Sequence, residues 1–183
     1  IAQMRPFALE HAQNMLRSES KFSFGDIATA LGKTELIPIS LKICRAMGTA
    51  AQVCVVVPSV PLRRQVASDF LDESSRARVG HSFTLNESSN DFDPSRGCDG
   101  FATTYQSVVA DSAGITADEI ERGQYLVVLD EVHHCARGGT WHRAIQPLVD
   151  AAKKVVLLSG SAERGDLAPI AFLPYQLRGG DRV

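Results

Sequence analysis

The hydrophobic and polar positions along this chain follow two alternating patterns. Short continuous apolar runs are typical of strands that are buried on both faces of a parallel sheet. Between them lie longer stretches with apolar residues at helical spacing, which predict amphipathic helices. The expected strands are residues 22–28, 52–57, 100–104, 125–129 and 154–158, and the expected helices are residues 5–17, 34–47, 61–70, 106–110, 117–123 and 141–152. This alternation predicts an α/β fold, with a mostly parallel central sheet flanked by helices.

One long segment breaks the pattern. Residues 72–99 are rich in Ser, Asn, Asp and Arg, without a clear apolar period. Such composition favours a surface excursion, with at most a short strand near residues 81–85. Gly48 stands where the preceding helix is expected to stop, because glycine accepts the left-handed conformation that ends many helices.

The composition narrows the class of protein. A chain of 183 residues with 44% hydrophobic and 22% charged residues fits one globular domain, residues 1–183. Its net charge of -2 gives no overall attraction to nucleic acid, so such contact needs a local patch. Four widely spaced cysteines favour thiols in a reducing compartment over disulfides or zinc. No apolar run reaches the roughly 20 residues that span a bilayer. We expect a cytoplasmic domain, and the first residue, Ile1, indicates a piece of a longer product.

The strand at residues 125–129 is followed at once by Asp130 and Glu131. The carboxyl edge of a parallel sheet is where open α/β folds bind their ligands. Paired carboxylates at that edge would hold a magnesium ion and orient a water molecule, provided that a phosphate-binding turn lies nearby.

Residues 28–34 provide a candidate turn. A strand, a loop of small residues and then Gly32-Lys33-Thr34 at the start of a helix is the layout of a phosphate cradle, in which backbone N–H groups face the anion. The first glycine of the strict G-x-x-x-x-G-K-T pattern would fall at Ile27, so that pattern fails. The alternative is an ordinary helix start that contains Gly-Lys-Thr.

Five motifs in order make the chain resemble the first RecA-like motor domain of a superfamily-two helicase of the DEAD/DEAH group. Residues 28–34 are similar to its phosphate loop, 130–133 to its D-E-x-H box, 56–65 to its strand with a Pro-Ser/Thr turn, 103–106 to its T-Y-Q segment, and 159–164 to its S/T-G-T-P-x-R motif. The resemblance covers nearly the whole chain. It implies a RecA-like P-loop NTPase fold, with ATP and Mg²⁺ as cofactors.

The resemblance also implies roles for individual residues. Nucleotide binding falls to Thr29, Ala30, Leu31, Gly32, Lys33, Thr34 and Arg5. Thr34 and Asp130 would ligate magnesium, and Glu131, Asp130 and Lys33 would be catalytic, with Glu131 orienting the attacking water. His133, Ser159 and Ser161 would couple hydrolysis to motion. Alternatively, His133 is simply a polar residue at a strand end.

Nucleic-acid contacts are implied for a further set of residues. These are Pro58, Ser59, Arg63, Thr104, Tyr105 and Gln106. Arg63, with its neighbour Arg64, either meets phosphates or solvates the outer side of a helix. Tyr105 either stacks on a ligand or sits in the core, and the core is slightly favoured.

Two departures from the family pattern bear on activity. Ala30 replaces a loop glycine, and Ala8 replaces the glutamine of an adenine-reading R-P-x-Q segment that begins at Arg5. Arginine fingers would come from a second RecA-like domain, in cis or in trans. We expect an ATP-dependent motor that acts on nucleic acid. The alternatives are a binding module without catalysis and the motor of a restriction or phage-defence nuclease.

The residues after 159 resemble those of bacterial and phage proteins. They favour DNA over RNA as the partner, and a bacterial or phage-infected cell as the setting.

Overall fold

The computed structural model describes residues 5–26, 33–161, 169–173, 177–178 and 181–182. At its centre lies a six-stranded sheet in which every pair of neighbouring strands is parallel. The strands are β1 (Phe22–Asp26), β2 (Gln52–Val57), β3 (Asn86–Glu87), β4 (Gly100–Thr104), β5 (Tyr125–Leu129) and β6 (Lys154–Ser159). Their order across the sheet is β1-β6-β5-β2-β4-β3. The predicted α/β class and the parallel sheet are confirmed.

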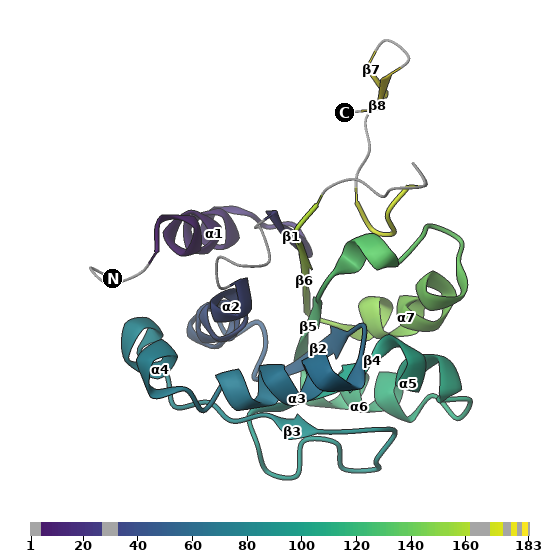
Figure 1. The fold of residues 1–183 in the computed structure, drawn as a ribbon, viewed down its shortest axis with the longest axis horizontal. Coiled ribbons are helices and arrows are strands. Elements are labelled where there is room, and N and C mark those ends of the chain that lie inside the picture. The colour runs from purple at the N-terminus through teal and green to yellow at the C-terminus, as the bar shows by residue number, and fades with distance from the viewer. Residues whose placement is uncertain (1–4, 27–32, 162–168, 174–176, 179–180, 183) are drawn as a thin grey trace.

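Helices cover both faces of the sheet, as Figure 1 shows. One face carries α1 (Pro6–Arg17), α2 (Leu36–Ala46), α3 (Val60–Asp69) and α4 (Glu73–Val79), and the other carries α5 (Tyr105–Ala110), α6 (Ile115–Gly123) and α7 (Thr140–Ala151). Two hydrophobic clusters fill the spaces between the sheet and these layers. The three-layer arrangement explains why β2, β4, β5 and β6 are continuous apolar runs, since both faces of these inner strands are buried.

Side chains along β5 alternate between the two faces of the sheet, so this one strand contributes to both hydrophobic clusters. Leu126 and Val128 belong to the cluster under α2, whereas Tyr125, Val127 and Leu129 belong to the cluster under α7. All five residues have a relative exposure of 0%. Burying each valine or leucine contributes roughly 1.5–3 kcal/mol, so β5 anchors the sheet and everything attached to its end.

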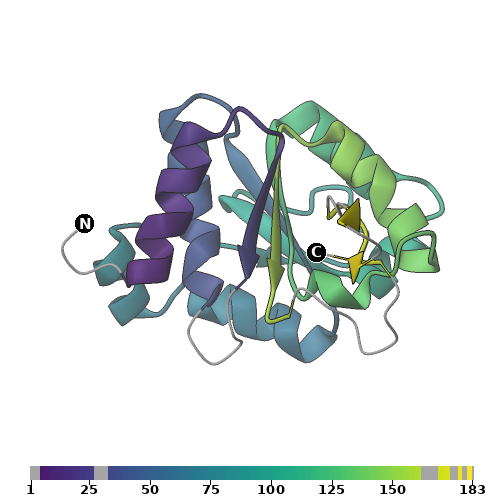
Figure 2. The same ribbon diagram turned by 90° about the horizontal axis from the view of Figure 1, so that it is seen from above.

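Because all the strands run in the same direction, their carboxyl ends meet at one edge. Figure 2 shows the strand arrows pointing the same way. The five sequence motifs follow β1, β2, β4, β5 and β6, and the described parts of all five therefore collect at this edge.

The segment at residues 72–99 is more ordered than its composition predicted. It contains α4, which the sequence analysis did not predict, and its short strand lies at Asn86–Glu87, not at residues 81–85. The Asp72 carboxylate caps α4 by accepting a hydrogen bond from the Ser75 backbone N–H at 2.7 Å. Gly80, with a φ of 69°, ends it in the left-handed conformation. Both capping signals were present in the sequence, but the helix is too short and polar to show an apolar period.

The remaining boundaries differ from the predictions by small amounts. A 3-10 turn, η2 (Lys33–Glu35), precedes α2, and Gly48 takes a φ of 67° just after α2, as expected of a helix stop. The predicted extension of the first strand to residue 28 falls outside the described residues. β7 (Leu177–Arg178) and β8 (Asp181–Arg182) form a separate antiparallel pair. None of the described helices is long and apolar enough to cross a membrane.

The close approach of β4 to β2 makes one glycine necessary. A Cβ atom on Gly100 would lie 1.9 Å from the carbonyl oxygen of Val53, which belongs to the backbone and cannot move aside. We expect Gly100→Ala to lower the free energy of unfolding by about 1–3 kcal/mol, measured by denaturant titration.

Gly25→Ala in β1 is the matched comparison, because its Cβ would meet only the ends of two leucine side chains at 3.0 and 3.1 Å. Equal losses for the two variants would show that the β2–β4 contact is not the cause.

Candidate functional site

The acidic pair Asp130-Glu131 lies at the carboxyl end of β5, in a strained turn. Glu131 has a φ of 51° and a ψ of 45°, a left-handed conformation that few residues other than glycine adopt. It leads into a 3-10 turn, η3 (Val132–His134). Strain of this kind persists only where the surrounding structure enforces it, and it is frequent at functional sites. Here the buried strand on one side and η3 on the other fix the direction of both carboxylates.

Lys33 reaches this pair from the start of α2, across 98 residues of sequence. Its ammonium lies 3.0 Å from Oδ1 of Asp130 and donates a hydrogen bond to Oε1 of Glu131. All three side chains are nearly buried, with exposures of 6% for Lys33, 9% for Asp130 and 12% for Glu131. The structure thus brings together the predicted phosphate-loop lysine and the predicted catalytic acids.

The surroundings of Asp130 favour the protonated form of its carboxyl group. Burial raises the pKa of Asp130 above its ordinary value of 3.8, and the nearby Glu131 carboxylate adds to the increase, while the Lys33 ammonium opposes it. Oδ1 of Asp130 also accepts a hydrogen bond from the Glu131 backbone N–H at 3.0 Å. The backbone carbonyl of Asp130 accepts one from the Tyr105 hydroxyl at 3.1 Å.

The second carboxylate oxygen of Glu131 retains its hydrogen-bonding capacity. Oε2 is buried and accepts no hydrogen bond from the described residues, although it lies 3.2 Å from Nδ1 of His133. A buried carboxylate oxygen of this kind is costly unless a water molecule or a cation meets it. The site therefore fits a nucleotide phosphate, which Lys33 would neutralise, together with a magnesium ion.

No group of three or more His, Cys, Asp and Glu side chains that could hold a metal ion occurs among the described residues. Magnesium differs from metals held in such protein cages, because it takes one or two carboxylates and completes its coordination with phosphates and water. The donor set at Asp130 and Glu131 is of that sparse kind.

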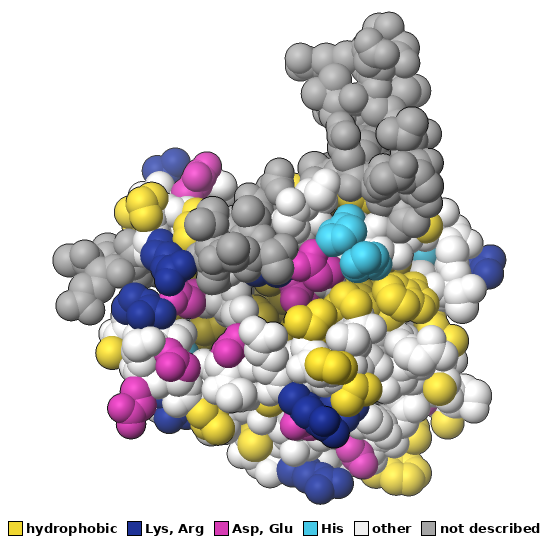
Figure 3. Space-filling view, in the orientation of Figure 1, with side chains coloured by type: hydrophobic (Ala, Val, Ile, Leu, Met, Phe, Trp, Pro, Cys, Tyr) yellow, Lys and Arg dark blue, Asp and Glu magenta, His cyan; other side chains and the backbone are white. Residues whose placement is uncertain are grey.

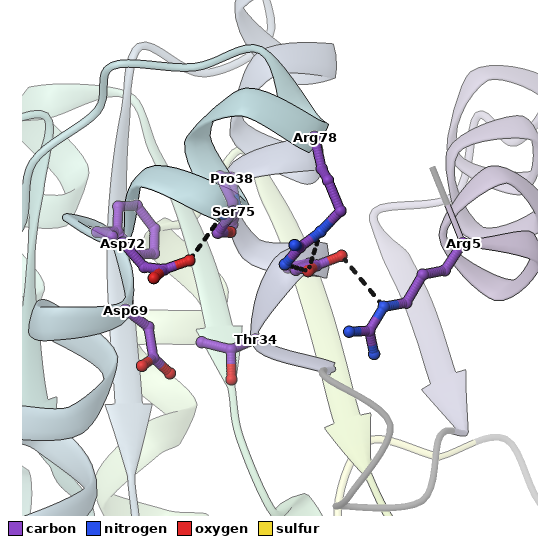
Figure 4. Close-up of a pocket in the computed structure, with 9 residues that line it drawn as sticks. Arg5, Thr34, Pro38, Asp69, Asp72, Ser75 and Arg78 are labelled. Carbon is purple, nitrogen blue, oxygen red and sulfur yellow. Dashed lines mark hydrogen bonds and ion pairs between the residues drawn. The ribbon is translucent and has the colours of Figure 1, made fainter. Parts of the chain in front are cut away.

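Thr34 and Arg5 flank Glu35 in the lining of one pocket, in which Figure 4 labels Thr34 and Arg5. Together they line a pocket of about 190 Å³ between the start of α2 and the α3–α4 corner. The Thr34 side chain faces Asp69, and its hydroxyl partly offsets the increase in the pKa of Asp69 that burial causes. Nε of Arg5 lies 3.9 Å from Oε2 of Glu35. The roles of Thr34 as a metal ligand and of Arg5 in nucleotide binding stay predictions.

His133 contacts the end of β6, where the proposed coupling motif begins. Its Nδ1 lies 2.8 Å from Oγ of Ser159. The Ser159 hydroxyl donates its only proton to the Ser161 carbonyl and also accepts a hydrogen bond from the Ser161 N–H at 3.2 Å. His133 must therefore donate through Nδ1. The contact joins His133 to Ser159, and the coupling role of His133, Ser159 and Ser161 stays a prediction.

The predicted nucleic-acid contact at Arg63 stays a prediction, and in this structure the Arg63 side chain is bonded to other residues of the fold. Its side chain is only 13% exposed, and its Nε lies 3.2 Å from Glu87 Oε2. Its Nη1 donates to the Ser88 carbonyl at 3.1 Å and to the Ser89 hydroxyl. Arg63 thus holds the segment after β3 in place. The neighbouring Arg64 is 71% exposed, and its Nε lies 4.0 Å from Oε2 of the same Glu87.

Tyr105 lies in the core, and its predicted contact with nucleic acid stays a prediction. Its side chain is completely buried, and its ring stacks on Trp141 at 4.6 Å with an interplanar angle of 3°. It occupies the core, the position that the sequence slightly favoured. Thr104 is likewise buried, and its hydroxyl caps α5 by accepting from the Ser107 N–H at 3.0 Å. Gln106 alone of this segment is exposed.

The turn before α3 is half-buried. Oγ of Ser59 accepts a long hydrogen bond of 3.5 Å from the Leu62 N–H, so Ser59 caps α3, and Pro58 lies just before it. Figure 3 shows acidic and histidine side chains side by side on this face of the molecule, with Lys and Arg side chains in several separate places around them. Pro58, Ser59 and Gln106 as nucleic-acid contacts stay predictions.

Several predicted residues fall outside the described part of the chain. These are Thr29, Ala30, Leu31 and Gly32 of the phosphate loop and residues 162–164 of the coupling motif. Ala8, which stands in place of the family's glutamine, is described and packs in the hydrophobic core beneath α1.

Sequence reasoning missed Arg78, which donates to Oε1 of Glu35 through Nε at 3.0 Å and also through Nη2. No local signal could have found it, because its partner lies 43 residues away.

Known proteins are similar to this chain over most of its length. It is 32% identical over 130 residues to the uncharacterized protein Rv2917 of Mycobacterium tuberculosis, a match that covers 70% of the chain and 20% of that relative. The chain thus spans only a fifth of the length of this relative.

Two solved structures share its fold. The Hef helicase domain of Pyrococcus furiosus is 20% identical, with a TM-score of 0.63 over 87% of this chain and 34% of Hef. A nuclease-deletion mutant of the Type ISP restriction-modification enzyme LlaGI, in complex with a DNA substrate mimic, is 17% identical, with a TM-score of 0.61 over 92% of this chain and 18% of LlaGI.

These likenesses confirm the predicted RecA-like fold of a helicase core. The family "Type III restriction enzyme, res subunit" matches residues 2–162, which is most of the chain. The chain belongs to this ResIII family, whose members carry the N-terminal motor domain of superfamily-two helicases.

Proposed function

We propose that this chain is the ATP-binding motor domain of a larger protein that moves along or unwinds nucleic acid, with DNA favoured over RNA. The observation that carries the proposal is the convergence of Lys33 with Asp130 and Glu131 at the carboxyl edge of the sheet. Membership of a family of helicase motor domains supports the same function. The match covers only 20% of the length of Rv2917, which supports a longer parent protein.

The residues of the site divide the work of phosphoryl transfer. When bound, ATP supplies the transferable phosphoryl group and Mg²⁺ neutralises the charge on its oxygens. Lys33 offers its ammonium to the phosphates and leaves the carboxylates that hold it in this structure. Asp130 holds the cation, directly or through water. Glu131 orients the attacking water with the carboxylate oxygen that accepts no hydrogen bond from the described residues.

Two further partners belong to the proposal. A second RecA-like domain, in cis or in trans, supplies the arginine fingers that complete the site. Nucleic acid passes over the sheet edge near Ser59, Arg64 and Gln106, where the exposed Arg64 guanidinium offers the positive charge that the whole chain lacks. DNA is favoured because the LlaGI structure holds a DNA substrate mimic.

A second candidate function is the motor of a restriction or defence nuclease. The family description and the likeness to LlaGI favour it. The two functions share the site described above and differ in what the rest of the protein does to DNA. Cleavage of DNA by the natural full-length protein would separate them.

We expect Lys33→Ala and Glu131→Gln to act differently. The first removes a phosphate partner and should weaken magnesium–ATP binding about 10- to 100-fold, as expected for charged hydrogen bonds. The second keeps the shape of the side chain and should preserve binding but slow hydrolysis at least about 100-fold. Calorimetry and a phosphate-release assay on the natural full-length protein, with and without DNA, measure both.

Wild-type protein that is folded but binds no nucleotide would overturn the proposal and favour a binding module without catalysis. Stimulation of hydrolysis by RNA but not by DNA would correct the choice of partner. Comparison of ATP with GTP shows whether Ala8 in place of glutamine has weakened the preference for adenine.

Asp130→Asn should raise the melting temperature of the ligand-free protein at pH 7. Because the pKa of Asp130 is raised in the folded state, the folded protein holds its proton at pH values where the unfolded chain releases it. The free energy of unfolding of the wild type therefore falls as pH rises from about 4 through that raised pKa, and the variant lacks this fall. Melting curves from pH 4 to pH 8 check this, and a lower melting temperature for the variant at pH 7 would contradict it.

A further inference from the structure

Glu35 is a buried acid directly beside the phosphate-binding residues. It ends the 3-10 turn η2 that begins with Lys33 and Thr34, and its side chain is 8% exposed. A carboxylate in such a position needs a cationic partner, because burial without one is costly. Whatever holds Glu35 therefore also holds the backbone turn that carries Lys33.

The main partner of Glu35 comes from a distant part of the chain. Arg78, in the last turn of α4, donates to Oε1 of Glu35 through both Nε and Nη2. Two donors of one planar guanidinium on a carboxylate fix both distance and direction, which a single ammonium cannot do. Arg5 approaches the other oxygen at 3.9 Å and is the looser of the two partners. Figure 4 shows the Arg78 and Arg5 side chains extending toward one another from α4 and from the residue before α1.

We propose that Arg78 is a positioning residue of the nucleotide site, which acts through Glu35 to hold the Lys33–Glu35 turn where Lys33 can meet a phosphate. The inference rests on the proposed function. It assigns a role to α4, whose capping residue Asp72 and last-turn Arg78 both line the pocket beside Thr34. Without Arg78, Glu35 turns toward solvent and draws the turn with it. A displacement of about 1 Å at a reacting site can lower the reaction rate by up to about 100-fold.

The test compares two arginines of the same helix in the natural full-length protein. Arg78→Met removes the guanidinium that holds Glu35. Arg76→Met is the matched control, because Arg76 donates to the backbone carbonyls of Phe70 at 2.8 Å and Phe83 at 3.2 Å and not to Glu35. Both variants lose an arginine that is bonded to the fold, so a general loss of stability affects both. Arg78→Lys keeps the charge but not the paired donors.

Two readouts separate this inference from the proposed function. Hydrogen exchange of the peptide that spans residues 33–40 in the ligand-free protein reports on the turn without nucleotide. We expect faster exchange in Arg78→Met and unchanged exchange in Arg76→Met. Calorimetry with magnesium–ATP should show affinity reduced about 10- to 100-fold in Arg78→Met, partly restored in Arg78→Lys and unchanged in Arg76→Met.

A double-mutant cycle tests the route of the effect. If Arg78 acts through Lys33, adding Arg78→Met to Lys33→Ala should reduce affinity by much less than it does in the wild type. Unchanged exchange in Arg78→Met, equal losses in both methionine variants, or fully additive losses would each overturn the inference. A wild type without nucleotide affinity would overturn the proposed function, and the exchange comparison would still decide whether Arg78 holds the turn.

Discussion

The contact on which the site depends is the ammonium of Lys33 held between the carboxylates of Asp130 and Glu131. Two adjacent acids at the end of a fully buried strand would repel each other and lose their hydration. The lysine offsets both costs in the ligand-free protein. The same ammonium is the group that would bind a nucleotide phosphate, so a ligand would replace the interaction that neutralises the two carboxylates.

Several local features of the site are unfavourable by themselves and are held in place by the rest of the fold. Glu131 adopts a left-handed backbone, and one of its oxygens accepts no hydrogen bond from the described residues. Burial keeps the pKa of Asp130 raised although a lysine is adjacent. Tyr105 supports the turn from below by donating its hydroxyl to the Asp130 carbonyl. The packing of β5 thus holds a strained turn in which one lysine faces two carboxylates. A site of this kind gains stability when it binds charged ligands.

Polar residues of the motifs serve the fold as well as the proposed chemistry. Ser59 and Thr104 cap helices, Arg63 anchors the segment after β3, and Tyr105 fills the core against Trp141. Arg64 and Gln106, by contrast, are exposed. A motif shared with a family therefore indicates the region of a proposed contact. Only the structure shows which side chains of that region are exposed.

The sequence by itself determined the α/β class, the strands and most of the helices, because continuous apolar runs and helical apolar spacing are local consequences of burial. It also identified Lys33, Asp130, Glu131 and His133, since their motifs follow strands whose carboxyl ends must meet in a parallel sheet. It did not predict α4, whose seven residues are too few and too polar to show a period.

Tertiary structure alone decided which polar residues find each other across the chain. The pairing of Glu35 with Arg78, the anchoring of Arg63 by the residues after β3, and the burial of Tyr105 against Trp141 all join segments that are distant in sequence. Charge and polarity in a sequence show that a side chain needs a partner or water. Only the packing of helices against the sheet determines which of the two it receives, because burial is a property of the whole fold.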